Sequence, residues 1–135
     1  MTQRWPAPGD IVWCRFPELP ATHPGPKPRP ALVIAVDERT DGVSVRVVYG
    51  TSQKVDRLRA GEFVITRLGH PGPFALAGLS HDTKFDLRAS IELPWGSVFF
   101  GVAPRAPHGQ TPKLGTLHPA LMRAAQAAWS ATRKR

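Results

Sequence analysis

Prolines constrain the fold of this chain more than any other residue type. Six of them lie in residues 17–30, at positions 17, 20, 24, 26, 28 and 30. Proline fixes φ and lacks a backbone N–H, so this density excludes a helix and a central strand alike. We therefore expect residues 17–30 to form a long, semi-rigid surface loop. A stiff connection of this length between core strands is more often functional than incidental.

The proline-rich segment ends in Pro28-Arg29-Pro30, directly before the apolar run 31–36. That run is rich in β-branched residues and far too short to span a membrane, so it predicts a buried strand. The prolines therefore hold Arg29 stiffly at the entrance of a core strand. The simplest interpretation is an exposed arginine beside that strand.

Strand patterns recur along most of the chain, and Asp41-Gly42 favours a hairpin turn between two of them. In the first strand, Val12, Cys14 and Phe16 alternate with Ile11, Trp13 and Arg15. Residues 83–93 also alternate, which predicts one apolar face and one solvent-exposed face that carries Lys84, Asp86 and Arg88. The predicted strands are 11–16, 31–36, 43–49, 62–67, 83–93 and 97–102, with residues 74–80 either strand or short helix.

Short strands at regular spacing with one terminal helix predict a mainly β fold, a small antiparallel barrel. We expect the barrel over residues 1–102, a Pro/Gly-rich linker over 103–117, and a basic C-terminal helix over 118–135 packed on the same domain. A stripe of Leu121, Ala125, Ala128 and Trp129 on that helix would pack on the barrel or across a dimer.

Charge is concentrated at the C-terminal end of the chain. The net charge is +8, and six basic residues but no acidic residue follow Glu92. This balance fits a polyanion such as nucleic acid, or an acidic protein partner, although a solvated basic tail is an equal alternative. The single cysteine, Cys14, and the lack of any apolar signal or membrane segment predict a cytoplasmic protein.

Several kinds of chemistry lack the residues that they need. The five histidines show no metal-ligand spacing and no carboxylate cluster accompanies them, so we expect neither a metal nor another cofactor. There is no G-x-S-x-G turn and no phosphate-binding glycine loop. Cys14 lies in mid-strand, where a buried, inert thiol is the usual outcome.

A polar rim remains as the candidate site. In a hairpin the start of one strand lies beside the end of the next, so Arg29 should meet Thr51 and Ser52. A guanidinium and a hydroxyl at one rim can hold a phosphate. The alternative for Thr51-Ser52 is a local bond from side chain to backbone, and for Lys84 and Asp86 an exposed ion pair.

Three segments in this order, 9–13, 29–34 and 47–52, resemble the MazF/PemK toxins of bacterial toxin–antitoxin modules. The stretch of residues 83–95 looks like the later strand of the PemK-like branch, so the resemblance covers roughly residues 9–95. It implies an SH3-like barrel with added helices, a homodimer, and metal-independent cleavage of single-stranded RNA at short sequences. Attack by the ribose 2′-hydroxyl would leave a cyclic phosphate. A cognate antitoxin is the implied protein partner.

The resemblance also implies the site residues. Arg29 and Thr51 match the arginine and threonine of the family, and Asp86 matches the aspartate of an Arg-x-Asp pair in which Lys84 replaces the arginine. We predict Arg29, Thr51 and Asp86 as catalytic residues, and Ser52, Lys84, His23 and Lys27 as substrate-binding residues. Gly50, before the threonine, also departs from many relatives.

Two other functions are compatible with the same residues. A relative with this fold poisons DNA gyrase by binding it, so the chain can be a non-enzymatic toxin with a protein target. A non-catalytic RNA-binding module, in which Arg29 and the basic tail only contact phosphates, is the other alternative.

Overall fold

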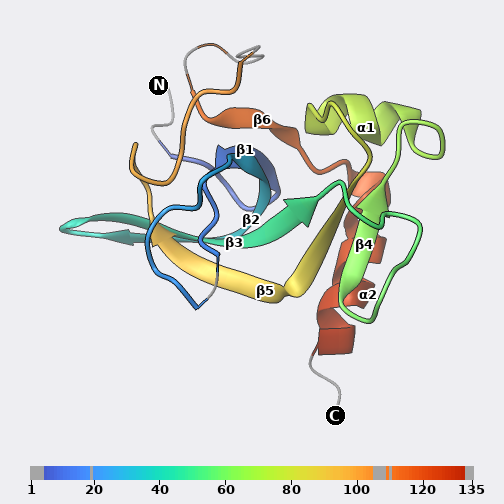
Figure 1. Ribbon diagram of the computed structural model, residues 1–135, viewed down its shortest axis with the longest axis horizontal. Coiled ribbons are helices and arrows are strands. Elements are labelled where there is room, and N and C mark those ends of the chain that lie inside the picture. Colours follow the sequence, from blue (N-terminus) through green and yellow to red (C-terminus); the bar gives the residue numbers. More distant parts are fainter. Residues whose placement is uncertain (1–4, 19, 105–108, 110, 133–135) are drawn as a thin grey trace.

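A six-stranded antiparallel sheet forms the body of the molecule in the computed structural model, which describes residues 5–18, 20–104, 109 and 111–132. The strand order is β4-β5-β3-β2-β1-β6, and the sheet curls into a half-barrel with α1 and α2 at one side (Figure 1). The predicted mainly β fold with a C-terminal helix is therefore confirmed. The elements are β1 (Asp10–Cys14), β2 (Arg29–Arg39), β3 (Gly42–Thr51), β4 (Glu62–Ile65), α1 (Pro71–Ala77), β5 (Thr83–Pro94), β6 (Lys113–Thr116), a 3-10 turn η1 (Pro119–Leu121) and α2 (Met122–Thr132).

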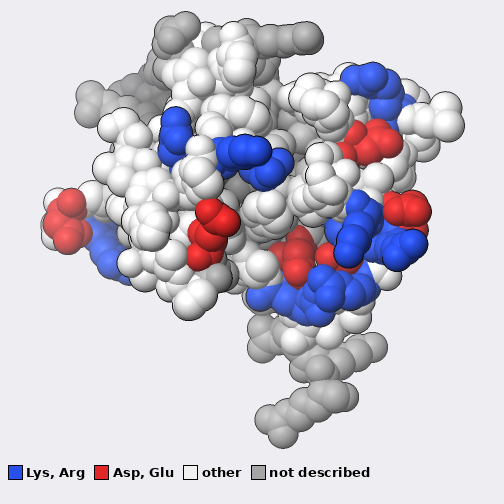
Figure 2. Space-filling model, viewed as in Figure 1, with Lys and Arg blue, Asp and Glu red and all other residues white. Residues whose placement is uncertain are grey.

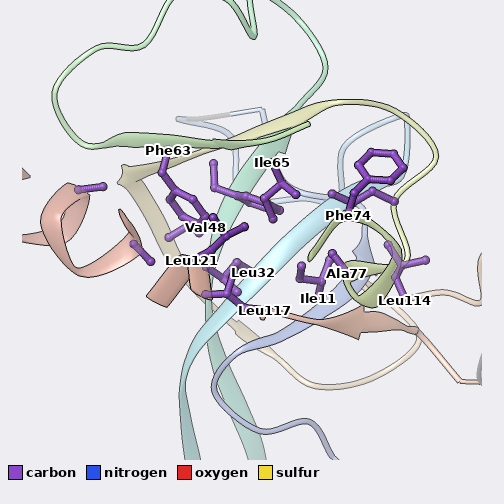
Figure 3. Packing of buried hydrophobic residues seen from close by; sticks show 14 of the residues in the cluster. Ile11, Leu32, Val48, Phe63, Ile65, Phe74, Ala77, Leu114, Leu117 and Leu121 are labelled. Atoms are coloured by element: carbon purple, nitrogen blue, oxygen red, sulfur yellow. The ribbon is translucent and has the colours of Figure 1, made fainter. Parts of the chain in front are cut away.

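Apolar side chains cover both faces of the sheet, which explains the unbroken apolar run of β2. Leu32 packs in the cluster on the helix side together with Phe63, Phe74 and Leu121 (Figure 3). Ala31 and Val33 lie in a second cluster on the opposite face. Because successive side chains of a strand point to opposite faces, a strand buried on both sides must be apolar throughout.

The alternation of β1 is confirmed by this division. Ile11 packs in the cluster on the helix side and Trp13 packs against it, while Val12, Cys14 and Phe16 belong to the cluster on the opposite face. The first strand of the chain therefore lies between the two cores.

Cys14 is fully buried in the second cluster, and burial raises the pKa of its thiol to about 12. The reactive form of cysteine is the thiolate, so at pH 8 the folded protein should resist iodoacetamide. We expect complete alkylation only after unfolding in guanidinium, measured as mass gain by intact-protein mass spectrometry. Rapid labelling of the native protein would contradict the buried position of β1.

The regular alternation predicted for β5 is wrong beyond Leu87. Val48 of β3 pairs with Ser90, but the next residue, Tyr49, pairs with Asp86, so residues 87–89 form a bulge. An odd number of unpaired residues reverses the face on which later side chains point. Phe85 consequently lies in the helix-side cluster and Leu93 in the other.

The C-terminal third departs from the sequence expectation at two places. Residues 97–102 form no strand, because the consecutive Phe99 and Phe100 both pack in the second cluster, whereas successive side chains of a regular strand point to opposite faces. Within the segment expected as a linker, residues 113–116 form β6, which pairs with β1. Gly115 enables this placement, since a Cβ there would lie 2.2 Å from the carbonyl oxygen of Leu76 in α1.

The two helices close the helix-side core. The ambiguous residues 74–80 fall mostly in α1, which buries Phe74 and Ala77. In the C-terminal helix Ala125 and Ala128 are buried as expected, whereas Trp129 is 40% exposed. The end of the predicted helix, residues 133–135, lies outside the described residues. Helix α2 packs against β4 and β5, and β5 carries part of the candidate site.

Candidate functional site

The pairing of β2, β3 and β5 places the predicted rim residues on one face of the sheet. Ala31 pairs with Tyr49, so Arg29 lies next to Thr51 at the open end of the hairpin. On the other side of β3, Tyr49 pairs with Asp86. Directly paired residues of antiparallel strands project to the same face. Arg29 and Asp86 thus flank β3 from its two sides, at two strand spacings, roughly 10 Å.

Arg29 opens into a pocket of about 520 Å³ beneath the proline-rich loop. Its side chain is half-buried, and among the described residues its guanidinium has no hydrogen-bond or ion-pair partner. Five N–H donors of a fixed cation are therefore available to a ligand. The residues that line the pocket are Phe16, Pro17, Glu18, Pro26, Lys27, Arg29, Tyr49 and Ala89.

Tyr49 is a member of this site that sequence reasoning missed. It is half-buried between Arg29 and Asp86, and its ring lies 5.3 Å from that of Phe16. The signal was present in the sequence, because residues two apart in a strand share a face and Tyr49 precedes Thr51 by two. The Tyr49 ring lines the same pocket as Arg29 and offers it a flat aromatic surface. Lys27 adds a second cation to this pocket.

The hydroxyl of Thr51 is oriented by its own turn. Its Oγ1 accepts a hydrogen bond of 3.1 Å from the backbone N–H of Gln53. The local bond considered as an alternative in the sequence is therefore present. It occupies a lone pair of the oxygen and leaves the O–H free to donate. A hydroxyl donor beside Arg29 remains compatible with phosphate binding.

Asp86 is paired with Arg88 rather than with Lys84. The Nε of Arg88 lies 3.1 Å from Oδ1 and its Nη2 lies 3.2 Å from Oδ2, a two-pronged contact. The hydrogen bond to Asp86 and its negative charge raise the pKa of Arg88 above the usual arginine value. Arg88 was placed on the solvent face in the sequence but was not recognised as the partner of Asp86.

Lys84 occupies a different environment from the one predicted, and its expected solvent-exposed position is wrong. The residue is buried, with its Nζ 3.1 Å from Oε1 of Glu62 and 2.9 Å from the carbonyl oxygen of Arg57. The same Glu62 oxygen accepts the backbone N–H of Arg59 at 2.7 Å. Lys84 thus links the loop between β3 and β4 to β5, and its ammonium donates to acceptors of the protein itself.

The remaining predicted residues are exposed. Ser52 follows Thr51 at the rim, whereas His23 lies in the proline-rich loop and does not line the Arg29 pocket. The structure therefore brings together Arg29, Thr51, Lys27 and Asp86 around β3, and leaves His23 apart.

The comparison with protein families decides the identity of this chain. The model of the PemK-like, MazF-like toxins of type II toxin–antitoxin systems matches residues 7–72. Over these residues, just under half of its 135, the chain is a PemK/MazF-like toxin. The matched segment of the toxin contains Arg29 and Thr51, and ends before Asp86. No curated protein matches the chain.

A type II toxin implies a cognate antitoxin, so a protein partner follows from family membership. None of the toxin's helices in the described part of the chain is long and apolar enough to cross a membrane. Within the same residues, no group of three or more His, Cys, Asp or Glu side chains could hold a metal ion.

Charged side chains of the toxin gather near the candidate site. Figure 2 shows basic and acidic residues interleaved over the loop that joins β3 to β4 and over the neighbouring part of β5. The basic side chains of this loop, Lys54, Arg57 and Arg59, are exposed and exceed its one acid, Asp56. The site therefore lies beside a surface that favours a polyanion.

Proposed function

We propose that this toxin is a sequence-selective, metal-independent endoribonuclease that cleaves single-stranded RNA. One observation carries the proposal: in the part of the chain that the structure describes, the guanidinium of Arg29 has no protein partner, and it lies beside Thr51, whose hydroxyl can donate. Such a pair can hold a phosphodiester and stabilise the extra charge of a phosphorane. Family membership supports the same reading.

The reaction needs three roles, and the residues around β3 can fill them. Asp86 accepts the proton of the ribose 2′-hydroxyl, whose oxygen then bonds to phosphorus. Arg29 and Thr51 stabilise the charged phosphorane. The bond from phosphorus to the 5′-oxygen breaks, and Lys27, in the same pocket as Arg29, supplies a proton to that oxygen. The products are a 2′,3′-cyclic phosphate and a 5′-hydroxyl.

The decisive experiment compares the wild type with Arg29→Ala on a mixed RNA pool in EDTA. We expect cleavage at a recurring short sequence, with cyclic phosphate ends identified by mass mapping. Arg29→Ala should lower the cleavage rate about 10²–10³-fold, as loss of a main charge-stabilising donor does. Arg123→Ala, which removes an exposed arginine of α2, is the control and should leave the rate unchanged. RNA that stays intact with the wild type would reject the proposal.

The proposal includes two assemblies that follow the family pattern. The toxin acts as a homodimer, and the antitoxin inhibits it by laying an acidic segment over the Arg29 rim and the basic β3–β4 loop. Opposite charge supports this choice of surface.

A second candidate function is a toxin that binds a protein target without catalysis. A largely apolar groove of about 580 Å³ between α2 and β2 favours it, with Met122 and Trp129 on one wall and Ile34 on the other. In that case Arg29→Ala would remain toxic in cells. A non-catalytic RNA-binding module would instead give salt-dependent binding with no cleavage products.

A further inference from the structure

Among the residues that the structure describes, Arg88 alone holds the carboxylate of Asp86. Arg88 donates three hydrogen bonds to it: the backbone N–H at 3.0 Å and Nε at 3.1 Å to Oδ1, and Nη2 at 3.2 Å to Oδ2. A bidentate guanidinium contact fixes the plane of a carboxylate as well as its position. No other described residue donates a hydrogen bond to Asp86.

Arg88 is itself held by its surroundings. The bulge of residues 87–89 is tied to the chain before β4, because the N–H of Leu87 donates to the carbonyl oxygen of Gly61 at 2.8 Å. A Cβ at Gly61 would lie 2.9 Å from Cγ of Arg88 and 3.0 Å from Cγ2 of Thr132 in α2. The stem of Arg88 thus packs into the space that a glycine with φ +92° leaves open.

The pattern of these bonds leaves one oxygen available. A carboxylate has about four acceptor positions, two on each oxygen. Oδ1 accepts two hydrogen bonds and Oδ2 accepts one. Oδ2 is therefore the atom of Asp86 that can take a further proton.

We infer that Arg88 is a positioning residue of the cleavage reaction, one that directs Oδ2 of Asp86 toward the ribose 2′-hydroxyl. This inference rests on the proposed ribonuclease function. Arg88 provides the cation beside Asp86, since the ammonium of Lys84 is buried against Glu62. Because Arg88 acts through Asp86, its loss should lower kcat and leave KM for RNA nearly unchanged.

A double-mutant cycle on the full-length toxin tests this role. We expect Asp86→Asn to lower kcat about 10²–10⁴-fold and Arg88→Gln to lower it about 10–100-fold, as loss of an orienting partner does. In the Asp86→Asn background, Arg88→Gln should have almost no additional effect. Arg88→Lys keeps the charge but loses the two-pronged contact, so it should restore only part of the rate.

The chain supplies a matched control. Asp37 and Arg39 in the β2–β3 hairpin have the same spacing, and Nε of Arg39 lies 2.8 Å from Oδ2 of Asp37. Arg39→Gln should leave kcat and KM unchanged, and circular dichroism should show all variants folded.

Four outcomes would overturn the inference. With an active wild type, a normal kcat in Arg88→Gln would do so while the ribonuclease function stands. Additive losses in the cycle, or a raised KM with normal kcat, would make Arg88 an independent phosphate contact. A wild type that cleaves no RNA would overturn the proposed function and this inference together.

Discussion

Replacing Lys84 with methionine should lower the free energy of unfolding by about 3–5 kcal/mol, because it leaves a buried carboxylate without its cation. The side chains of Lys84 and Glu62 are only 8% and 3% exposed. Without the ammonium, Glu62 keeps only the backbone N–H of Arg59, and the carbonyl oxygen of Arg57 loses its donor. The measurement is urea unfolding followed by tryptophan fluorescence.

Two variants separate this effect from a general loss of charge. The Nζ of Lys113 lies 3.5 Å from Oδ1 of Asp10, and the lysine side chain is 40% exposed. Lys113→Met should therefore lower the free energy of unfolding by at most about 1 kcal/mol. Removing both buried charges, in Glu62→Leu with Lys84→Met, should recover most of the stability that the single variant loses. A single variant as stable as the wild type would mean that Lys84 lies in solvent.

Gly50→Ala should disturb both stability and cleavage. A Cβ at this position would lie 2.6 Å from the carbonyl oxygen of Pro30 and 2.8 Å from Cε1 of Phe85. The ring of Phe85 is fully buried and the Pro30 oxygen belongs to the backbone, so β2 must move away from β3 next to Arg29. We expect a loss of about 1–3 kcal/mol from overpacking. A shift of the order of 1 Å in Arg29 should also lower the cleavage rate by about 10²-fold.

Gly72→Ala provides the matched comparison for Gly50→Ala. This glycine lies in α1 with nothing within 4 Å of the position a Cβ would take. Its substitution should leave cleavage unchanged and stability equal or slightly higher, since alanine favours a helix. Equal thermal midpoints and equal cleavage rates in both variants would show that β2 and β3 do not approach closely at Pro30.

Local sequence determined the half of the site that depends on one hairpin. The prolines before Arg29 and the turn at Asp41-Gly42 required β2 and β3 to be neighbours, and that pairing places Arg29 beside Thr51. Both effects act over a few residues of chain, through fixed φ angles and the alternation of side chains. Sequence reasoning could therefore predict this rim and the barrel-like fold around it.

Only the tertiary structure decided the part of the candidate site that β5 contributes. The bulge at residues 87–89 depends on how β5 pairs with β3 and β4, and it reverses the alternation that the sequence displays. Lys84 is buried because Glu62, 22 positions earlier in the chain, lies on the neighbouring strand. No local pattern distinguishes such a lysine from an exposed one. The position of Arg29 beside Thr51 could thus be predicted from the sequence. The environment of Asp86 depended on contacts between distant segments.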